Sequence, residues 1–341
     1  MRDDLGPLLD PWDFALPDAQ IARVPAVIRD QSRLYAVTPA TSGPAGIFAD
    51  ILARFRPGDV LVLNDVTVMR ARLRARRATG GAVEVVVSGP AGEGTFHAFV
   101  SPSRRLSVGE RLVCGDGEMV LVKRHEDGTW TVLPVPDLAT LTASAGEVPL
   151  PPYLGRAPVA DDVARYQTVY AREGELRASA APTAGLHFTP ELLAMIEAKG
   201  VEVHRVALEV GAGTFKPLDR RAWVTGKLHT ERFYLPLYTF EAVSRARMDG
   251  RRVIAVGTTS LRVLETDPKP GAGSTDLFIR PGFEFEAVDV LITNFHLPRS
   301  SLLMLVTTFG GHDRVMSAYN DAIAEGFRFY SYGDAMWVER G

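Results

Sequence analysis

A histidine directly before a predicted helix is the first group in this sequence that could perform chemistry. Residues 180–189 read AAPTAGLHFT, and Thr189, Pro190 and Glu191 are typical of the cap and first turn of a helix. The open amides at a helix N-terminus bind anionic or electron-rich groups, and imidazole titrates near neutral pH. The segment therefore predicts either a ligand site at His187 or a structural loop whose histidine bonds main-chain carbonyls.

Four polar, glycine-bearing or hydroxyl-bearing segments follow predicted strands. They are 210–215 (VGAGTF), 257–260 (GTTS), 293–298 (TNFHLP) and 331–334 (SYGD). Ligands of α/β enzymes bind beyond the carboxyl ends of the strands, so four such segments together predict a shared crevice. Tight turns and helix caps explain each segment about equally well when it is considered alone. Their spacing matches neither a Walker loop nor a dinucleotide fingerprint, which argues against ATP and NAD.

Two further patterns carry charge. His229 and Glu231 alternate in KLHTERF, which predicts an acid/base pair on one strand face or, alternatively, a solvated strand. Arginines also alternate in VMRARLRARR, and a strand there presents them as one cationic stripe, suited to phosphate contact or to simple solvation. The stripe consists of Arg70, Arg72, Arg74 and Arg76.

Other chemistries find little support in the sequence. The seven histidines are dispersed and none pairs at i, i+4, so we expect no metal site. No G-x-S-x-G elbow is present, which argues against a Ser-His-Asp hydrolase. The net charge of −3 restricts any nucleic-acid contact to a local patch.

The elements that position these groups fall into two patterns. From about residue 59 to 134 the chain shows short, turn-punctuated strands, and a proline-rich linker follows at 146–158. Beyond residue 161, strand and helix patterns alternate, and residues 12–55 are expected to join that part. We predict an α/β fold with a mixed, largely parallel sheet, built from residues 1–58 and 151–341. A small β-barrel domain, residues 59–150, is predicted to be inserted into it.

Bulk properties predict where the protein works. The lone cysteine, Cys114, excludes an internal disulfide and suits a reducing compartment. No apolar run approaches the length of a membrane span, and the N-terminus is acidic where a signal peptide is basic. We therefore expect a cytoplasmic protein without a membrane partner, and a monomer as the default state.

Taken together, the segments resemble the S-adenosylmethionine:tRNA ribosyltransferase-isomerases of queuosine biosynthesis. The matching runs occur in the family's order along nearly the whole chain. They are RYQTVYA (165–171), AAPTAGLHFT, VGAGTF, VIAVGTTSLRVLE, ITNFHLP, SLLMLV and SYGDAM, with weaker matches in GDVLVLND and GEVPLPPYL. The resemblance implies an α/β domain with an inserted β-barrel, as the element pattern also predicts.

The resemblance also implies a reaction. The ribosyl moiety of S-adenosylmethionine moves to 7-aminomethyl-7-deazaguanine at the tRNA wobble position, giving epoxyqueuosine and releasing adenine and methionine. This chemistry needs a base for the proton beside the sulfonium, a proton donor for adenine, and a pocket that admits an everted base. The aminomethyl group must also be neutral to act as a nucleophile. The implied partner is the anticodon stem-loop of tRNA.

Candidate residues can be assigned to these roles as hypotheses. His187 and His296 are the leading acid/base groups, and Asp289 binds ribose hydroxyls or the amine. His229 and Glu231 are a further acid/base pair. The candidates for binding S-adenosylmethionine are Gly211, Gly213, Thr214, Thr258, Thr259, Ser260, Arg262 and Asn294. The candidates for RNA contact are the four-arginine stripe and the aromatic residues Tyr166, Tyr170, Phe215 and Tyr332, for which core packing is the alternative.

The chain departs from the family pattern at a few positions. Val66 and Thr67 stand where the family reads Thr-Arg, Ser101 replaces an arginine, and Glu209 replaces a histidine. Two of these changes remove cations near the predicted barrel, and one turns a titratable base into a carboxylate. Three alternatives therefore stay open: the full reaction on tRNA, ribosyl transfer to another acceptor, and a non-catalytic RNA-binding relative.

Overall fold

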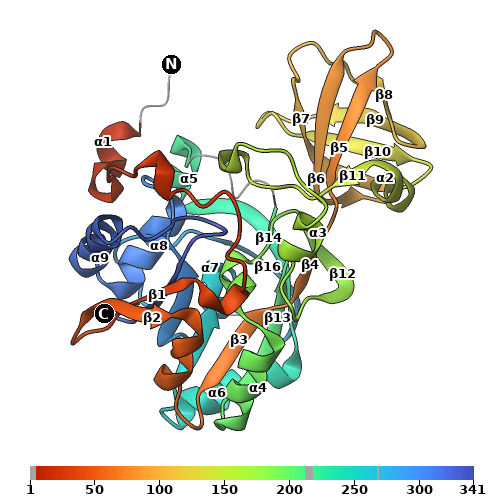
Figure 1. The fold of residues 1–341 in the computed structure, drawn as a ribbon. Coiled ribbons are helices and arrows are strands. Elements are labelled where there is room, and N and C mark those ends of the chain that lie inside the picture. Colours follow the sequence, from red (N-terminus) through yellow and green to blue (C-terminus); the bar gives the residue numbers. More distant parts are fainter. Residues whose placement is uncertain (1–4, 212–217, 267–268) are drawn as a thin grey trace.

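A mixed nine-stranded sheet organises the larger part of the molecule (Figure 1). The computed structural model describes residues 5–211, 218–266 and 269–341. In sheet order the strands are β16 (Gly271–Leu277), β14 (Lys227–Leu235), β13 (Glu202–Leu208), β3 (Val60–Asn64), β15 (Val253–Val256), β17 (Val290–Asn294), β18 (Ala335–Glu339), β1 (Arg33–Val37) and β2 (Ser42–Ile47). The central strands β13, β3, β15 and β17 run parallel, while the outer pairs β13–β14, β14–β16 and β1–β2 are antiparallel.

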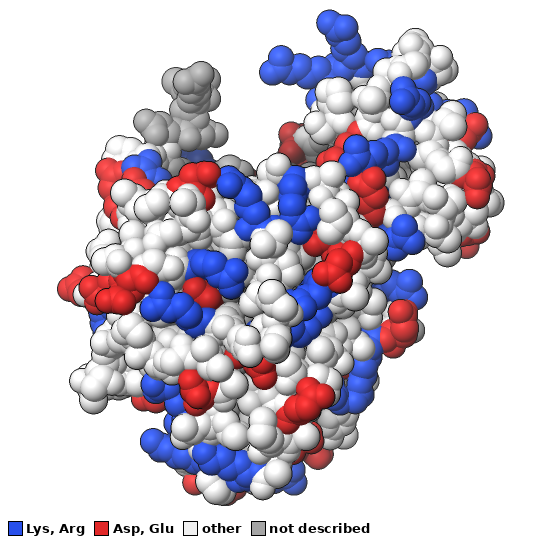
Figure 2. Space-filling view, viewed as in Figure 1, with Lys and Arg blue, Asp and Glu red and all other residues white. Residues whose placement is uncertain are grey.

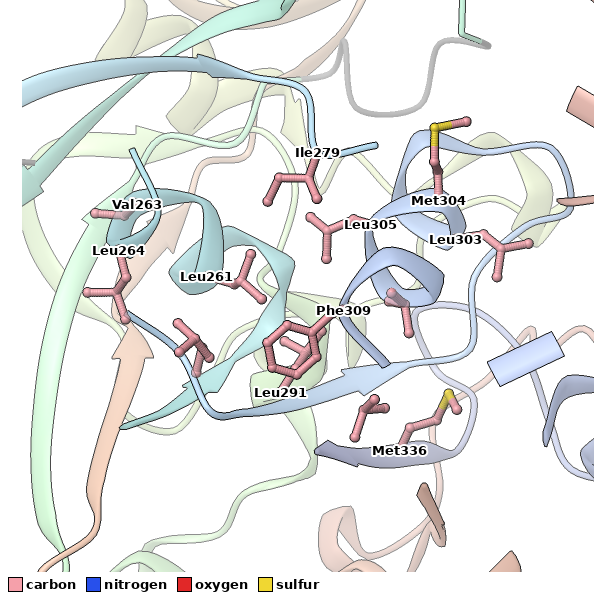
Figure 3. Packing of buried hydrophobic residues seen from close by; sticks show 14 of the residues in the cluster. Leu261, Val263, Leu264, Ile279, Leu291, Leu303, Met304, Leu305, Phe309 and Met336 are labelled. Carbon is pink, nitrogen blue, oxygen red and sulfur yellow. The ribbon is translucent and has the colours of Figure 1, made fainter. Parts of the chain in front are cut away.

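Helices cover both faces of this sheet, as is required for parallel strands buried on two sides. One face packs against α6 (Leu237–Met248), α7 (Gly257–Leu264), α8 (Ser301–Gly310) and α9 (His312–Ala324). The other packs against the 3₁₀ segments η4 (Phe48–Arg54) and η6 (Thr183–His187) and against α4 (Pro190–Ala198). Figure 3 shows the first core, where Leu261 of α7 and Leu305 and Phe309 of α8 surround Leu291 of β17.

The shorter elements lie between and beside these layers, except α2, which packs against the strands of the smaller sheet. They are α1 (Gly6–Leu9), α2 (Leu138–Ala145), α3 (Asp162–Arg165), α5 (Arg220–Thr225), η1 (Asp10–Trp12), η2 (Asp18–Gln20), η3 (Arg29–Gln31), η5 (Pro152–Leu154) and the paired strands β12 (Arg172–Ala178) and β4 (Val66–Val68).

A closed antiparallel barrel protrudes from this body (Figure 1). Its strand order is β5 (Arg72–Arg77), β6 (Ala82–Gly92), β7 (Thr95–Ser101), β10 (Trp130–Val135), β9 (Gly117–Arg124) and β8 (Arg111–Cys114), and β8 pairs back with β5. The short β11 (Gly146–Glu147) adds to the outside of β5. Alternate residues fill a separate core inside the barrel. The predicted fold class, a mixed α/β sheet with a small β-barrel, is confirmed.

One strand lies in a different sheet from the one predicted. The sequence interpretation begins the barrel at residue 59, yet β3 pairs in parallel with β13 and β15 of the large sheet. All five of its residues are buried, which is typical of a strand covered on both faces and not of a barrel strand that alternates. We therefore propose that the inserted domain begins after β4, and we keep residue 150 as its end.

The core around β17 generates a stability prediction. Leu291 is fully buried, so Leu291→Ala is expected to lower the free energy of unfolding by about 2–5 kcal/mol through lost contacts and a cavity. Met248→Ala on α6 is the control, because Met248 is 78% exposed. Denaturant unfolding followed by circular dichroism measures both. Equal midpoints for the two variants would contradict this packing.

Candidate active site

The segment η6 lies across the carboxyl end of the parallel strands, where it contacts β17 and α7. It approaches its surroundings so closely that Gly185 has no room for a side chain, since a Cβ there would lie 1.9 Å from the Tyr170 hydroxyl. Helix α4 follows, and Thr189 caps it as predicted by accepting a hydrogen bond from the Leu192 amide at 3.1 Å. The predicted loop-to-helix junction is therefore present, and it fixes His187.

His187 is buried and hydrogen-bonded through both ring nitrogens. Its Nδ1 lies 2.6 Å from Ser32 Oγ and its Nε2 lies 3.0 Å from Asn294 Nδ2, while the ring stacks on Phe48. Burial, together with the charges of Arg328 and Arg29, lowers the pKa of His187 to about 3. The imidazole is therefore neutral at pH 7, with no ring nitrogen left over for a substrate. Its direct effect is to orient Asn294.

His296 lies at the end of the same strand but on its other side. Its Nε2 is 2.9 Å from Thr293 Oγ1, and its main-chain N–H donates to the Tyr319 hydroxyl. Burial lowers its pKa to about 4, so this imidazole is also neutral at pH 7. Because Thr293 and Asn294 are consecutive strand residues, they direct the two histidines to opposite faces of the sheet.

The start of α7 supplies polar atoms beside η6. Gly257 has φ +84°, which favours glycine, and a Cβ at this position would lie 3.7 Å from that of Ala184 in η6. The Ser260 hydroxyl donates a hydrogen bond to the Val256 carbonyl at 2.8 Å. In contrast, Thr259 Oγ1 is buried and has no hydrogen-bond partner within the described part of the chain, and the same holds for Asn294 Oδ1. Buried polar atoms without partners are costly, so these two are candidate ligand contacts.

Glu231 and Arg262 form a buried ion pair, which the sequence interpretation did not foresee. Arg262 donates to Glu231 Oε2, and Gly211 donates its main-chain N–H to Glu231 Oε1 at 3.3 Å. The predicted pairing of Glu231 with His229 is wrong, because a register shift in β14 leaves His229 exposed while Glu231 is buried. The candidates Gly213, Thr214 and Phe215 lie outside the described residues.

Asp289 lies at the wrong end of its strand for the predicted role. It precedes β17, where its carboxylate accepts from the Val253 main-chain N–H at 2.9 Å and pairs with Arg340 at 3.1 Å. It lines a separate hollow of about 850 Å³ at the amino edge of the sheet. The prediction placed Asp289 by its nearness to Asn294 in sequence, but a five-residue strand separates its two ends by roughly 15 Å.

The aromatic candidates that the structure describes are buried and not exposed on the surface. Tyr166, Tyr170 and Tyr332 are each no more than 6% exposed. Tyr332 donates to Asp162 at 3.1 Å and packs edge-on against Tyr166. Burial raises the pKa of all three phenols. They form a wall around η6 and are not a surface for stacking in this conformation.

Three of the four arginines in the predicted stripe point outward from the barrel, whereas the Arg72 side chain is only 14% exposed and donates to the Leu150 carbonyl at 3.0 Å. Arg70, Arg74 and Arg76 are exposed, whereas the intervening Leu73 and Ala75 fill the barrel core. Part of the stripe is already neutralised, since Arg74 bonds Glu147 at 2.8 Å and Arg72 lies 3.5 Å from Glu84. No carboxylate within ion-pair distance of Arg70 or Arg76 occurs among residues that the structure places.

Comparisons with known proteins show the family to which the chain belongs. A family model described as queuosine biosynthesis protein matches residues 9–338. A relative from Anaeromyxobacter sp. (strain K), named S-adenosylmethionine:tRNA ribosyltransferase-isomerase, is 44% identical over 97% of this chain and 99% of its own length. A protein of the same name from Syntrophotalea carbinolica is 45% identical over the same shares. The chain belongs to the queuosine biosynthesis protein family.

The likeness also includes a solved structure, so it extends from sequence to fold. The crystal structure of S-adenosylmethionine tRNA ribosyltransferase from Thermotoga maritima has a TM-score of 0.55 and 35% identity. It covers 96% of this chain, which in turn covers 99% of it. Within the described ranges, no helix is long and apolar enough to span a membrane, and no cluster of three potential metal ligands is found.

The residues that depart from the family pattern make contacts with their neighbours. Thr67 donates its hydroxyl to the Arg172 carbonyl at 2.7 Å, and Val66 is buried. Glu209 is 7% exposed, pairs with Arg232 at 2.8 Å, and lies against Gly89 of the barrel strand β6. Burial raises the pKa of Glu209, and Arg232 opposes that shift. Ser101 is exposed at the end of β7. Glu209 therefore stands where the body meets the barrel.

The sequence interpretation overlooked one titratable group at this edge. Asp65 follows β3 directly, its side chain is 14% exposed, and its nearest cation, Arg172, is 3.9 Å away. Burial raises its pKa to about 6, close to the working range of an acid or base. The sequence signal was available, because Asp65 is a polar residue after a buried strand. It was missed because β3 was assigned to the barrel.

Asp65 generates a prediction about pH. Its pKa is higher in the folded state than in the unfolded chain, so its charge destabilises the fold increasingly as pH rises from about 4 to 6. Asp65→Asn is expected to stabilise the protein by on the order of 2 kcal/mol at pH 7.5 and to have little effect at pH 3.5. Thermal unfolding at both pH values measures this. The same change in melting temperature at each pH would contradict it.

Proposed function

We propose that this chain transfers and isomerises the ribosyl moiety of S-adenosylmethionine onto 7-aminomethyl-7-deazaguanine at the tRNA wobble position. The products are epoxyqueuosine-tRNA, adenine and methionine. The observation that carries the proposal is the pair of buried atoms Thr259 Oγ1 and Asn294 Oδ1, which have no hydrogen-bond partner among the described residues and belong to elements that contact η6. The names of the relatives support both the donor and the tRNA acceptor.

Thr258, Thr259 and Asn294 would hold S-adenosylmethionine in this arrangement. The first residues of α7 present open main-chain N–H groups, and the Thr259 hydroxyl and Asn294 carbonyl add one donor or acceptor each. Ser260 is excluded, because its hydroxyl is committed to its own helix. Arg262 lies further along α7, and its ion pair with Glu231 of β14 would not touch the ligand. The pair would influence the ligand through the polar groups that lie around it.

Two groups fit the proton transfers. His296 lies at the same carboxyl edge as Asn294 but on the sheet face opposite His187. It is neutral at pH 7, so across that edge it would accept the proton beside the sulfonium and return it to departing adenine. Asp65 is largely ionised at pH 7, so it can accept a proton from the aminomethyl group and leave the amine neutral. His187 is a positioning residue in this scheme, because both its nitrogens hold protein atoms.

The tRNA would approach from the side that the barrel and body share. The arginine stripe supplies cations for phosphate contact, because Arg70 and Arg76 have no carboxylate partner in the part of the chain that the structure describes. Tyr166, Tyr170 and Tyr332 would frame the space for an everted base instead of stacking on the surface. We also propose that the protein acts in the cytoplasm as a monomer, without a metal.

Ribosyl transfer to another acceptor is the second candidate. Glu209 favours it, because a carboxylate paired with Arg232 occupies the junction where the family carries a histidine. Incubation with S-adenosylmethionine and tRNA bearing the aminomethyl deazaguanine, followed by nucleoside mass spectrometry, decides between the two. Epoxyqueuosine is the expected product. Adenine release only with a different acceptor would favour the second candidate, and RNA binding without turnover would indicate a non-catalytic relative.

Thr259→Val separates a ligand contact from a structural role. The hydroxyl has no partner in the described protein, so its removal is expected to leave the melting temperature unchanged or higher. Binding of S-adenosylmethionine, measured by calorimetry, is expected to weaken about tenfold through the lost hydrogen bond. The control is Asp289→Asn at the opposite edge, for which binding should match wild type. If only the Asp289 variant lost binding, S-adenosylmethionine would bind at the amino edge of the sheet and not at the carboxyl edge.

A further inference from the structure

Two arginines next to η6 bind main-chain carbonyls instead of carboxylates. Arg29 donates to the Leu186 carbonyl at 3.0 Å and to the Ala164 carbonyl at 2.9 Å. Arg165 donates to the carbonyls of Ala26 and Val27. These contacts fasten the loop 22–28, α3 and η6 to one another. A carbonyl accepts a hydrogen bond but does not neutralise a charge, so both guanidiniums keep their full positive charge.

The positive charge of this pair is poorly compensated. Burial lowers the pKa of Arg29, and the neighbouring charge of Arg165 lowers it further. The buried carboxylate nearby, Asp162, is already held by both terminal nitrogens of Arg156. Arg165 Nε is buried without a partner in the described structure. Two like charges held together in this way favour a bound anion.

The pair opens onto an exposed face and not into an enclosed pocket. Val27 is 92% exposed, Ile28 47% and Val163 48%, so apolar side chains border the two guanidiniums. The loop and α3 lie on the front of the body, below the barrel (Figure 1). Figure 2 shows this face with Lys and Arg gathered beneath the notch between barrel and body. The turn after α3 also reaches the barrel connection, since Gln167 bonds the main chain of Val68 in both directions.

We propose that Arg29 and Arg165 form a binding site for a backbone phosphate of the RNA substrate. This inference rests on the proposed function and adds a contact that the arginine stripe does not include. An open cationic surface with an apolar border suits an extended polyanion, whereas the carboxylate of a small ligand needs an enclosed site. The site adjoins Leu186, the residue before His187, so a phosphate here would place the RNA directly over η6.

Val27→Glu tests this site without disturbing the contacts that hold it. The side chain is exposed, and only the main chain of Val27 binds Arg165, so the fold and its melting temperature should not change. The new carboxylate would compete with a phosphate for the two guanidiniums. Binding of a tRNA anticodon stem-loop oligonucleotide is expected to weaken about tenfold, and the slope of log affinity against log salt should fall by about one. Arg165→Gln should produce the same two changes.

The controls make each outcome decisive. Met248→Glu on α6 adds the same charge at a distant exposed position, and it should leave RNA binding near wild type. Val27→Lys should strengthen RNA binding. Unchanged RNA affinity and salt slope in Val27→Glu would overturn the proposal, and so would weakened binding of S-adenosylmethionine with RNA binding intact. If wild type binds no RNA, the proposed function fails together with this site.

Discussion

A short chain of hydrogen bonds through one neutral imidazole joins three separate parts of the sequence. Asn294 at the end of β17 donates to His187 Nε2, His187 Nδ1 contacts Ser32 Oγ, and Ser32 in turn lies 3.5 Å from the Arg29 carbonyl. This order places the proton on Nδ1, because Nε2 accepts from the Asn294 amide N–H. Protonation of the ring would set an Nε2–H against the Asn294 N–H that donates to it here. The arrangement thus depends on His187 staying neutral, which its burial ensures.

The hydrogen bonds of that chain determine which polar atoms around it remain for a ligand. With its amide nitrogen used by His187, Asn294 leaves its carbonyl oxygen for a ligand. Thr259, whose hydroxyl also lacks a partner among the described residues, belongs to α7, and both α7 and β17 contact η6. The helix start at Gly257 approaches η6 because neither Gly257 nor Ala184 carries a long side chain. Apolar packing on both faces of the sheet fixes the position of these strand ends, while Thr259 Oγ1 and Asn294 Oδ1 have no hydrogen-bond partner among the described residues.

Sequence periodicity predicted most of the fold, because buried parallel strands read as continuous apolar runs and their helices as amphipathic segments. It also predicted that 257–260 and 293–298 lie beyond strand ends. Three errors have physical causes. An apolar run does not say which sheet it joins, so β3 and Asp65 were assigned wrongly. A register shift in β14 separated His229 from Glu231, and strand direction placed Asp289 at the far edge. Arg29 was missed because its partners are main-chain carbonyls, which have no signature in sequence.

Amide hydrogen exchange with and without S-adenosylmethionine tests most directly whether the carboxyl edge is the binding site. The account predicts slower exchange in peptides that contain residues 183–187, 257–260 and 294–296, with the amino edge unchanged. Protection confined to the hollow around Asp289 and Arg340 would contradict it, because that hollow lies at the opposite ends of the same strands.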